Sequence, residues 1–304
     1  MTSRHRHCTR WIAILVVLWS VASPVTVANS DRLICVPALH AGQKFVYRVR
    51  YKTQKSTRAD SHIATLQAPE EMDSDTERYV AVEIKGVQGN GSNAQVIMRT
   101  QLLPTDGTPR PSDEGVVEFS LMPDGRADAL RGFDVLSSDE QALWRQWIAQ
   151  FALGWTFPAK GVKRGDKWKK EEPVVGAALA KLVWEKQLEY VREEACPATG
   201  ESAGAVNNSV GQCAVVVTTS TMKQESSHDD ATPDDYKLHQ LKTSGAAQGK
   251  TDVLTFISLK TGMLERANED SAQRLDVLVA KADESNKVHF NVQATSHAEV
   301  ILIQ

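Results

Sequence analysis

Three groups of residues in this sequence have the side-chain types that catalytic or metal-binding sites use. The first is the segment 200–204, Gly-Glu-Ser-Ala-Gly, which matches the Gly-x-Ser-x-Gly string of a nucleophile elbow. In such an elbow a strained turn between a strand and a helix exposes the serine. Here the string lies in a small, polar loop between two segments that both predict strands. The sequence therefore indicates a flexible loop rather than a nucleophile at Ser202.

The second and third groups contain histidine. The segment 228–239 combines carboxylates, which suit calcium, with imidazoles, which suit zinc. Its residues are His228, Asp229, Asp230, Asp234, Asp235 and His239. It contains neither an Asp-x-Asp-x-Asp-Gly loop nor a His-Glu-x-x-His pair, so a solvated loop is the better interpretation. His289 and His297 lie on one predicted strand, about 26 Å apart. We therefore predict no catalytic residue, no metal site and no cofactor, and we favour a non-catalytic protein.

Cysteine spacing predicts one disulfide. Cys196 closes a predicted strand and Cys213 opens the next one, so the two can face each other across the base of a hairpin. An oxidising compartment permits such a bond, and it would contribute about 3 kcal/mol in the chain-entropy model. Two free buried thiols are the alternative. Cys35 would then be left unpaired.

Aromatic residues are concentrated between residues 144 and 168, although they make up only 6% of the chain. One interpretation is a helix packed over a concave sheet, with tryptophans filling the gap. The other is that the rings line the mouth of an apolar pocket suited to lipid tails or hydrophobic peptide. The pattern leaves both open. The candidate ligand-binding residues are Trp144, Trp147, Phe151, Trp155 and Trp168.

The elements that must position these residues are mainly strands. Apolar and polar residues alternate with period two, most clearly where Val288, Phe290 and Val292 alternate with His289 and Asn291. Such alternation predicts strands with one buried and one wet face. Similar runs cover residues 45–51, 80–85, 95–102, 181–190 and 275–279. The apolar, β-branched run 213–219 predicts a strand covered on both faces, whereas the polar segment 53–77 predicts no strand.

One segment has helical periodicity. Ser137 and Glu140 have capping-box spacing, and Leu143, Trp147 and Phe151 follow on one helical face. We therefore expect one helix near 138–153.

Two pairs of similar segments suggest an internal duplication. Residues 42–45 (Gly-Gln-Lys-Phe) resemble residues 165–168 (Gly-Asp-Lys-Trp), and Phe119 precedes Gly125 by six residues as Phe256 precedes Gly262. The expected fold is mainly β, with one curved antiparallel sheet or two similar ones. Its expected divisions are a first antiparallel β half, a helix and aromatic connector, and a second antiparallel β half, at 29–135, 136–164 and 165–304.

The N-terminus predicts export. Arg4, Arg6 and Arg10 precede an apolar stretch, 11–22, and small residues continue to Ala28. This is the layout of a secretory signal peptide, residues 1–28, and its apolar stretch is shorter than the about 20 residues of a spanning helix. Export would place the protein in the periplasm or outside the cell. Removing three arginines and no acids takes the net charge from −3 to −6, which argues against nucleic acid and anionic lipid headgroups as partners.

Residues 157–168 resemble a Phe-Pro-x-Lys-x-Val-x-x-Gly-Asp-x-Trp signature of uncharacterised exported β-rich proteins of bacterial envelopes. Those proteins also begin with a Gly-x-x-aromatic strand, as at 42–45, and have a late Phe-x5-Gly hairpin, as at 256–262. The resemblance implies no reaction. In outline the chain is similar to periplasmic lipoprotein carriers, in which a curved antiparallel sheet and a helix enclose an apolar cavity.

These observations support three functional hypotheses. The first is an exported, non-catalytic protein that binds an apolar ligand such as lipid or a lipoprotein tail. The second is a structural or interaction module with a protein partner in the cell envelope. The third, a hydrolase, depends only on Ser202. The sequence does not indicate an oligomeric state.

Overall fold

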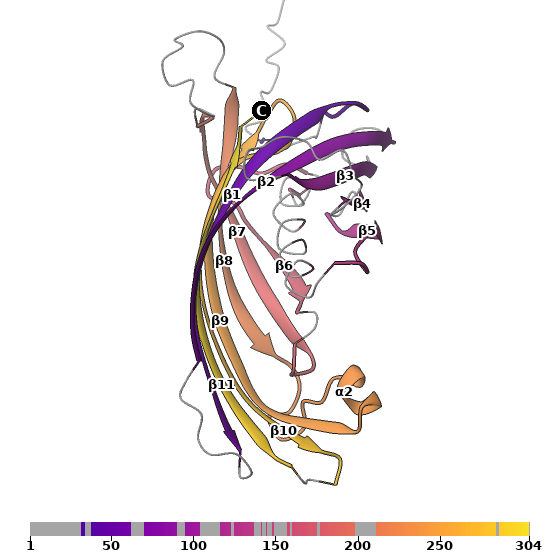
Figure 1. Ribbon diagram of the computed structural model, residues 1–304. Helices are drawn as coiled ribbons and strands as arrows, with labels where there is room; N and C mark the ends of the chain where they lie inside the picture. Colours follow the sequence, from indigo (N-terminus) through magenta and orange to yellow (C-terminus); the bar gives the residue numbers. More distant parts are fainter. Residues whose placement is uncertain are drawn as a thin grey trace, which may run out of the picture. The chain divides into compact units, whose positions relative to one another are not determined.

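The alternating segments form eleven antiparallel strands of one sheet in the computed structural model of the chain (Figure 1). The structure describes residues 32–33, 38–61, 70–89, 95–103, 116–122, 125–136, 141, 144, 148, 157–158, 160–174, 177–197, 211–283 and 286–303. The strands are β1 (Lys44–Ser61), β2 (Glu70–Gln88), β3 (Gln95–Leu103), β4 (Val116–Leu121), β5 (Ala127–Arg131), β6 (Lys167–Pro173), β7 (Leu182–Ala195), β8 (Gln212–Gln224), β9 (Leu241–Ser258), β10 (Leu264–Lys281) and β11 (Val288–Leu302).

The strand order places the first and last strands side by side. It runs β5-β4-β3-β2-β1-β11-β10-β9-β8-β7-β6. The two edges, β5 and β6, are therefore consecutive in the chain, and the segment between them connects one edge to the other. The mainly β prediction is confirmed, and the two halves form one sheet rather than two.

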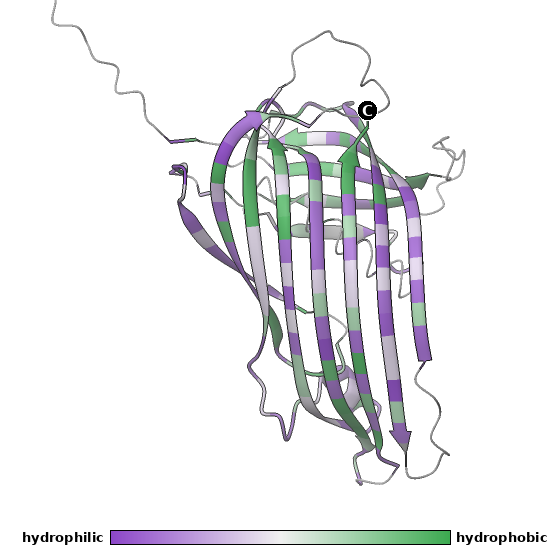
Figure 2. Cartoon of the chain, turned by 90° about the vertical axis from the view of Figure 1, so that its left-hand side faces the viewer, coloured by the Kyte–Doolittle hydropathy of each residue, from purple (hydrophilic) through white to green (hydrophobic). Residues whose placement is uncertain are grey.

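Alternation gives the sheet two chemically different faces. Directly paired residues of antiparallel strands point to the same face, so the register assigns each side chain to a face. On β1, Tyr47 and Val49 are buried on what we call the inner face, while Arg48 and Arg50 lie on the outer face. The long strands bend toward the inner face, which is concave (Figure 1). Figure 2 shows the hydropathy alternation along the strands from the outer side.

Apolar side chains on the inner face form separate clusters. We call the largest the upper cluster; it contains Tyr47, Val49, Val253, Ala267 and Val300 among others. The edge cluster is Leu188, Val216 and Ile257, with Phe157 and Trp168 against it. The lower cluster is Leu179, Leu182, Ala231, Ala247 and Val277, with Leu275 and Val279 against it. The short helix α2 (Asp234–Leu238) follows Ala231 on the same, concave side (Figure 1).

The predicted absence of strand across residues 53–77 is wrong. Strand β1 continues to Ser61 and β2 begins at Glu70, and their ladder runs without a break from Lys44 to Thr57. Threonine and β-branched residues favour strands even where hydropathy does not alternate. Polar composition was therefore a poor guide, because this part of the sheet is polar on both faces.

Backbone contacts support the predicted duplication. Gly42 and Gly165 both have positive φ, 87° and 84°. Their N–H groups donate to the carbonyls of Ile84 and Tyr190 respectively, each at 2.7 Å. Ile84 and Tyr190 also begin matching register shifts, in β2 against β3 and in β7 against β8. The entry to β1 and the entry to β6 are thus built in the same way.

The predicted match of Phe119 with Phe256 is off by one residue. Following the paired residues from Ile84 on β2 across β3 leads to Phe119 on β4. Following them from Tyr190 on β7 across β8 leads to Thr255 on β9, one residue before Phe256. The turn that follows is one residue longer in the second half. In the second half the Ser258 N–H donates a hydrogen bond to the Met263 carbonyl, whereas in the first half the Met122 N–H donates to the Arg126 carbonyl. Because this turn is one residue longer, Phe256 precedes Gly262 by the same six residues that separate Phe119 from Gly125.

Cys196 and Cys213 lie at disulfide distance, with their sulfurs 2.05 Å and their Cα atoms 4.9 Å apart. The bond joins the ends of β7 and β8, as the sequence predicted. The predicted signal peptide, 1–28, and Cys35 lie outside the described residues. Of the predicted helix 138–153, Gln141, Trp144 and Ile148 are described, and all three are helical. In the described part of the chain, no helix has both the length and the hydrophobicity needed to cross a membrane.

The repeat predicts equal effects of two substitutions. A Cβ added at Gly42 or Gly165 meets nothing within 4 Å, so an alanine there is disfavoured only by its positive φ. We expect Gly42→Ala and Gly165→Ala each to lower the free energy of unfolding by about 1 kcal/mol, measured by urea denaturation. Gly86→Ala is the control, because its Cβ would lie at an ordinary 3.7 Å from Ile97. A large effect at only one of the two sites would contradict the shared construction.

Candidate functional site

The structure places the two described candidate tryptophans in different clusters. Trp144 is 1% exposed and belongs to the upper cluster. Trp168 packs against the edge cluster, with its ring centroid 5.3 Å from that of Phe157. The indole N–H of each is buried and has no hydrogen-bond partner within the described ranges. Trp147, Phe151 and Trp155 lie outside the described residues.

A polar seam separates the upper cluster from the edge cluster. Thr255 is paired with Ala267 of the upper cluster on one side and with Val216 of the edge cluster on the other. Thr218 is 2% exposed and Thr255 is 0% exposed. Both hydroxyls are buried, and neither has a hydrogen-bond partner in the described part of the chain. An unpaired buried hydroxyl costs about 1–3 kcal/mol, so two of them on neighbouring strands require an explanation.

Below this seam, one row of the inner face consists entirely of hydroxyl side chains across six strands. Thr251 and Ser271 in the row hydrogen-bond to each other at 3.2 Å, whereas the buried Thr53 hydroxyl has no partner among the described residues. We call this the hydroxyl row: Ser74, Thr53, Ser296, Ser271, Thr251 and Ser220. It separates the upper apolar cluster from the apolar residues further along the same strands.

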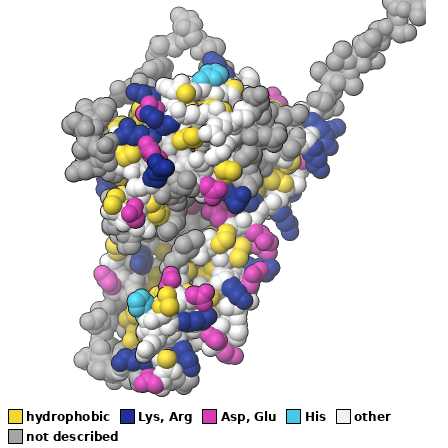
Figure 3. Space-filling model, turned by 90° about the vertical axis from the view of Figure 1, so that its right-hand side faces the viewer, with side chains coloured by type: hydrophobic (Ala, Val, Ile, Leu, Met, Phe, Trp, Pro, Cys, Tyr) yellow, Lys and Arg dark blue, Asp and Glu magenta, His cyan; other side chains and the backbone are white. Residues whose placement is uncertain are grey.

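The next row of the inner face is open to solvent. Met72 is 49% exposed, and Lys55 and Gln273 in the same row are exposed as well. Beyond them the inner face is apolar again, with the partly exposed side chains of Val292 and Phe290. Figure 3 faces this side and shows hydrophobic side chains in a hollow with charged side chains around it. This stretch of the concave face is therefore accessible, with polar side chains in its first row and apolar ones beyond it.

Two acidic side chains also belong to the inner side. Glu269 on β10 is paired with Ala298 and Val253, which are both buried there. Burial raises the pKa of Glu265, against the effect of a hydrogen bond from Ser258. Burial, and then the charge of Glu265, raise the pKa of Tyr47 well above its ordinary value. Any ligand at the seam would meet these carboxyl groups nearby.

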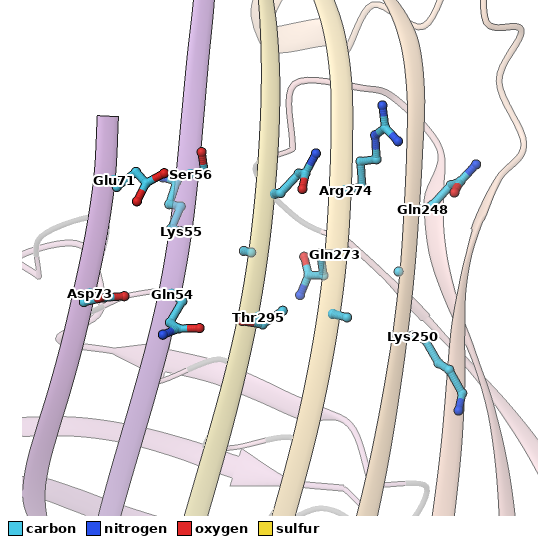
Figure 4. Close-up of a pocket in the computed structure, with 14 residues that line it drawn as sticks. Gln54, Lys55, Ser56, Glu71, Asp73, Gln248, Lys250, Gln273, Arg274 and Thr295 are labelled. Carbon is cyan, nitrogen blue, oxygen red and sulfur yellow. The ribbon is translucent and has the colours of Figure 1, made fainter. Parts of the chain in front are cut away.

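The outer face carries a polar groove of about 720 Å³ that crosses five strands, β2, β1, β11, β10 and β9 (Figure 4). Its side chains come from two rows of the outer face, and the backbone between the rows forms its floor. The first row is Asp73, Gln54, Thr295, Ala272 and Lys250. The second row is Glu71, Ser56, Gln293, Arg274 and Gln248.

The acidic and the basic side chains of the two rows lie at opposite ends of the groove. Glu71 and Asp73 lie at the β2 end, and Arg274 lies about 14 Å away across three strand spacings. These three side chains have no ion pair or hydrogen bond within the described residues. Lys250 at the same end as Arg274 pairs with Asp252 at 2.7 Å. Amides and hydroxyls fill the space between the two ends.

Comparisons with known proteins leave the identity of the chain open. No family model and no curated protein matches the sequence. Two solved structures are similar at 8% identity. One is a protein classed as exported, with a YmcC-like fold, from Bacteroides fragilis, with a TM-score of 0.27 over 85% of this chain and 98% of that one. The other is the outer membrane protein OprG from Pseudomonas aeruginosa, with a TM-score of 0.19 over 86% of this chain and 97% of that one. Likeness at these scores supports no functional argument.

The other chemical motifs are accounted for locally. Ser202 lies outside the described residues, between β7 and β8, two strands of one hairpin. In the acidic segment 228–239, Asp230 accepts hydrogen bonds from Thr232 and Asp234 pairs with Lys237 at 2.9 Å. Among the described residues, no group of three or more His, Cys, Asp or Glu side chains is arranged to hold a metal ion.

The two outer-face histidines also have separate partners. His289 contacts Asp276 at 2.7 Å, and this hydrogen bond lowers the pKa of Asp276. His297 contacts Asp270 at 2.8 Å. The two histidines therefore do not share one site, in agreement with the separation predicted from the sequence.

Sequence reasoning missed the groove and the hydroxyl row. Both are assembled from residues that are far apart in the chain, since each strand contributes one or two side chains. A usable signal was present in β11, where the inner positions change from Val292 to the small residues Ala294, Ser296 and Ala298. Small side chains on the concave face leave room above the sheet.

The burial of Trp144 predicts a structural cost when it is truncated. We expect Trp144→Ala to lower the free energy of unfolding by about 3–5 kcal/mol, because a fully buried ring would leave a cavity. Leu238→Ala, at a side chain that is 81% exposed, is the control and should change stability by less than about 0.5 kcal/mol. Chemical denaturation measures both. A small loss at Trp144 would instead mean that the ring lines an open mouth.

Proposed function

We propose that this protein is an exported, non-catalytic binding protein that holds an apolar chain, such as a lipid or a lipoprotein tail, on the concave face of its sheet. The observation that carries the proposal is the accessible stretch of the inner face that lies beyond the hydroxyl row and beside the lower cluster. Met72, Val292 and Phe290 keep part of their surface exposed there, although an apolar side chain gains about 25 cal/mol for each Å² that is buried. A bound apolar chain would cover that surface.

The geometry of β11 supports an elongated ligand. From Ala298 to Val292 its inner positions run for about 20 Å along the strand. The first three are small, Ala298, Ser296 and Ala294, and the following ones are larger and apolar. A straight chain lying along the strands would pass over the small residues and reach the apolar ones.

Export is the second part of the proposal. It is supported by the N-terminal sequence 1–28 and by the Cys196–Cys213 pair at disulfide distance, because disulfides persist in oxidising compartments. The protein would then act in the periplasm or outside the cell, where apolar chains need a carrier through water.

A pair of adjacent substitutions tests the proposed ligand face. Ala294 points to the inner face and Thr295 to the outer face of the same strand. We expect Ala294→Trp to weaken binding of a fluorescent fatty-acyl probe by about tenfold, which corresponds to about 1.4 kcal/mol, because the ring fills the ligand's space. Thr295→Trp should bind the probe as the parent protein does. Equal affinities of the two variants, measured by fluorescence titration, would refute binding on the concave face.

The outer groove favours a second candidate function, recognition of a protein partner in the envelope. Glu71 and Asp73 at one end and Arg274 at the other have no ion pair within the described residues, and complementary charges select and orient partners. An extended polypeptide with a basic and an acidic part would match this arrangement. The amides between the two ends would serve its backbone groups.

Photo-crosslinking tests the groove as a partner site. A photoreactive residue in place of Gln293, between the two charged ends, should capture a defined protein in intact cells. The adduct should disappear with Arg274→Glu and weaken at high salt, because exposed charges are screened. The control places the photoreactive residue at Leu238 on α2, which is 81% exposed. An adduct that forms equally from Leu238, or that survives the charge reversal, would contradict the groove as a specific site.

A further inference from the structure

The unpaired groups of the polar seam have a common chemical requirement. The indole N–H of Trp168 can only donate a hydrogen bond, while the hydroxyls of Thr218 and Thr255 can donate or accept. All three are buried without a hydrogen-bond partner among the residues that the structure describes. Nearly all buried polar groups in folded proteins are hydrogen-bonded, so an acceptor on a bound molecule would satisfy these groups.

The register fixes where that acceptor would lie. Thr218, Leu188 and Trp168 occupy one row on β8, β7 and β6, and Thr255 is one step along the neighbouring strand β9. The two threonines lie where the upper cluster meets the edge cluster. The hydroxyl row follows on the same two strands at Ser220 and Thr251, and the open apolar stretch lies beyond that row on β1, β2 and β11, two or more strands from Thr255. A ligand lying obliquely across the strands from that stretch would present its polar end to the seam.

We propose that the polar seam binds the carbonyl oxygen of an acyl ester or acyl amide, so that the ligand is an acylated molecule and not a hydrocarbon or a free fatty acid. This rests on the proposed function, which supplies the acyl chain. A carbonyl oxygen accepts two hydrogen bonds and carries no charge. It therefore satisfies the threonine hydroxyls without adding a charge to an apolar site.

Acidic side chains beside the seam disfavour the free acid at that place. Glu269 lies in the same inner row as Thr218, separated from it by Val253, and Glu265 lies near the buried Tyr47. A ligand carboxylate would face these acids in a poorly solvated site, where like charges disfavour each other. Lys186, two strands from Thr251 in the hydroxyl row, is already paired with Glu172.

Isosteric removal of the two hydroxyls tests the proposal. Two probes with the same pyrene-labelled chain are compared by fluorescence titration, a monoacylglycerol and the corresponding alkane. The parent protein should bind the ester about fivefold more tightly than the alkane, the contribution of one net hydrogen bond. The double variant Thr218→Val, Thr255→Val should bind both probes equally, with unchanged affinity for the alkane. The free acid of the same chain should bind more weakly than the ester to the parent protein.

Two controls separate the outcomes. Thr221→Val lies on the same strand but is exposed on the outer face, and it should keep the preference for the ester. Without ligand, the double variant should melt at or above the temperature of the parent protein, because it loses unpaired buried hydroxyls. The assignment of the seam would be wrong if the parent protein bound alkane and ester equally, or if the double variant kept the preference for the ester. Neither result would contradict the proposed function. If the parent protein binds neither probe, the proposed function fails with it.

Discussion

The pairing of β1 with β11 is the interaction on which the rest of the structure depends. It joins the first and last strands over fifteen consecutive residue pairs, from Tyr47 with Leu302 to Ser61 with Val288. Because side chains alternate between faces, a slip of one residue would exchange the inner and outer faces of every strand beyond it. This one ladder therefore aligns the two halves so that their apolar residues meet on the same side.

The central position of β1 and β11 also decides what the sheet can bind. The two strands that the chain brings together last are long, and their inner positions near the middle are small or hydroxylated, as Thr53, Ala294 and Ser296 show. Long-range pairs of this kind form late, since closing a long loop is entropically unfavourable. The face that we propose binds a ligand is thus complete only when both halves are in register.

The sequence predicted the strands where hydropathy alternates or where the run is apolar and β-branched, and it failed where both faces are polar. β11 was predicted correctly because Val288, Phe290 and Val292 alternate with polar residues. The lower part of β1 was missed because its inner positions Thr53 and Lys55 are as polar as its outer ones. Those inner positions are polar because they lie in or beside the hydroxyl row, so the failure of the pattern marks the part of the sheet that we propose has a function.

The tryptophans illustrate the same limit for the site. Their proximity in sequence suggested one aromatic surface, yet Trp144 and Trp168 belong to different clusters with the seam of Thr218 and Thr255 between the clusters. No spacing rule connects these four residues, because they come from a helical segment and three different strands. Valine at positions 218 and 255 would fill the same space and remove a cost of about 1–3 kcal/mol for each hydroxyl. Threonine is thus the less stable choice for the free protein, and the acceptor that we propose for the seam would offset this cost.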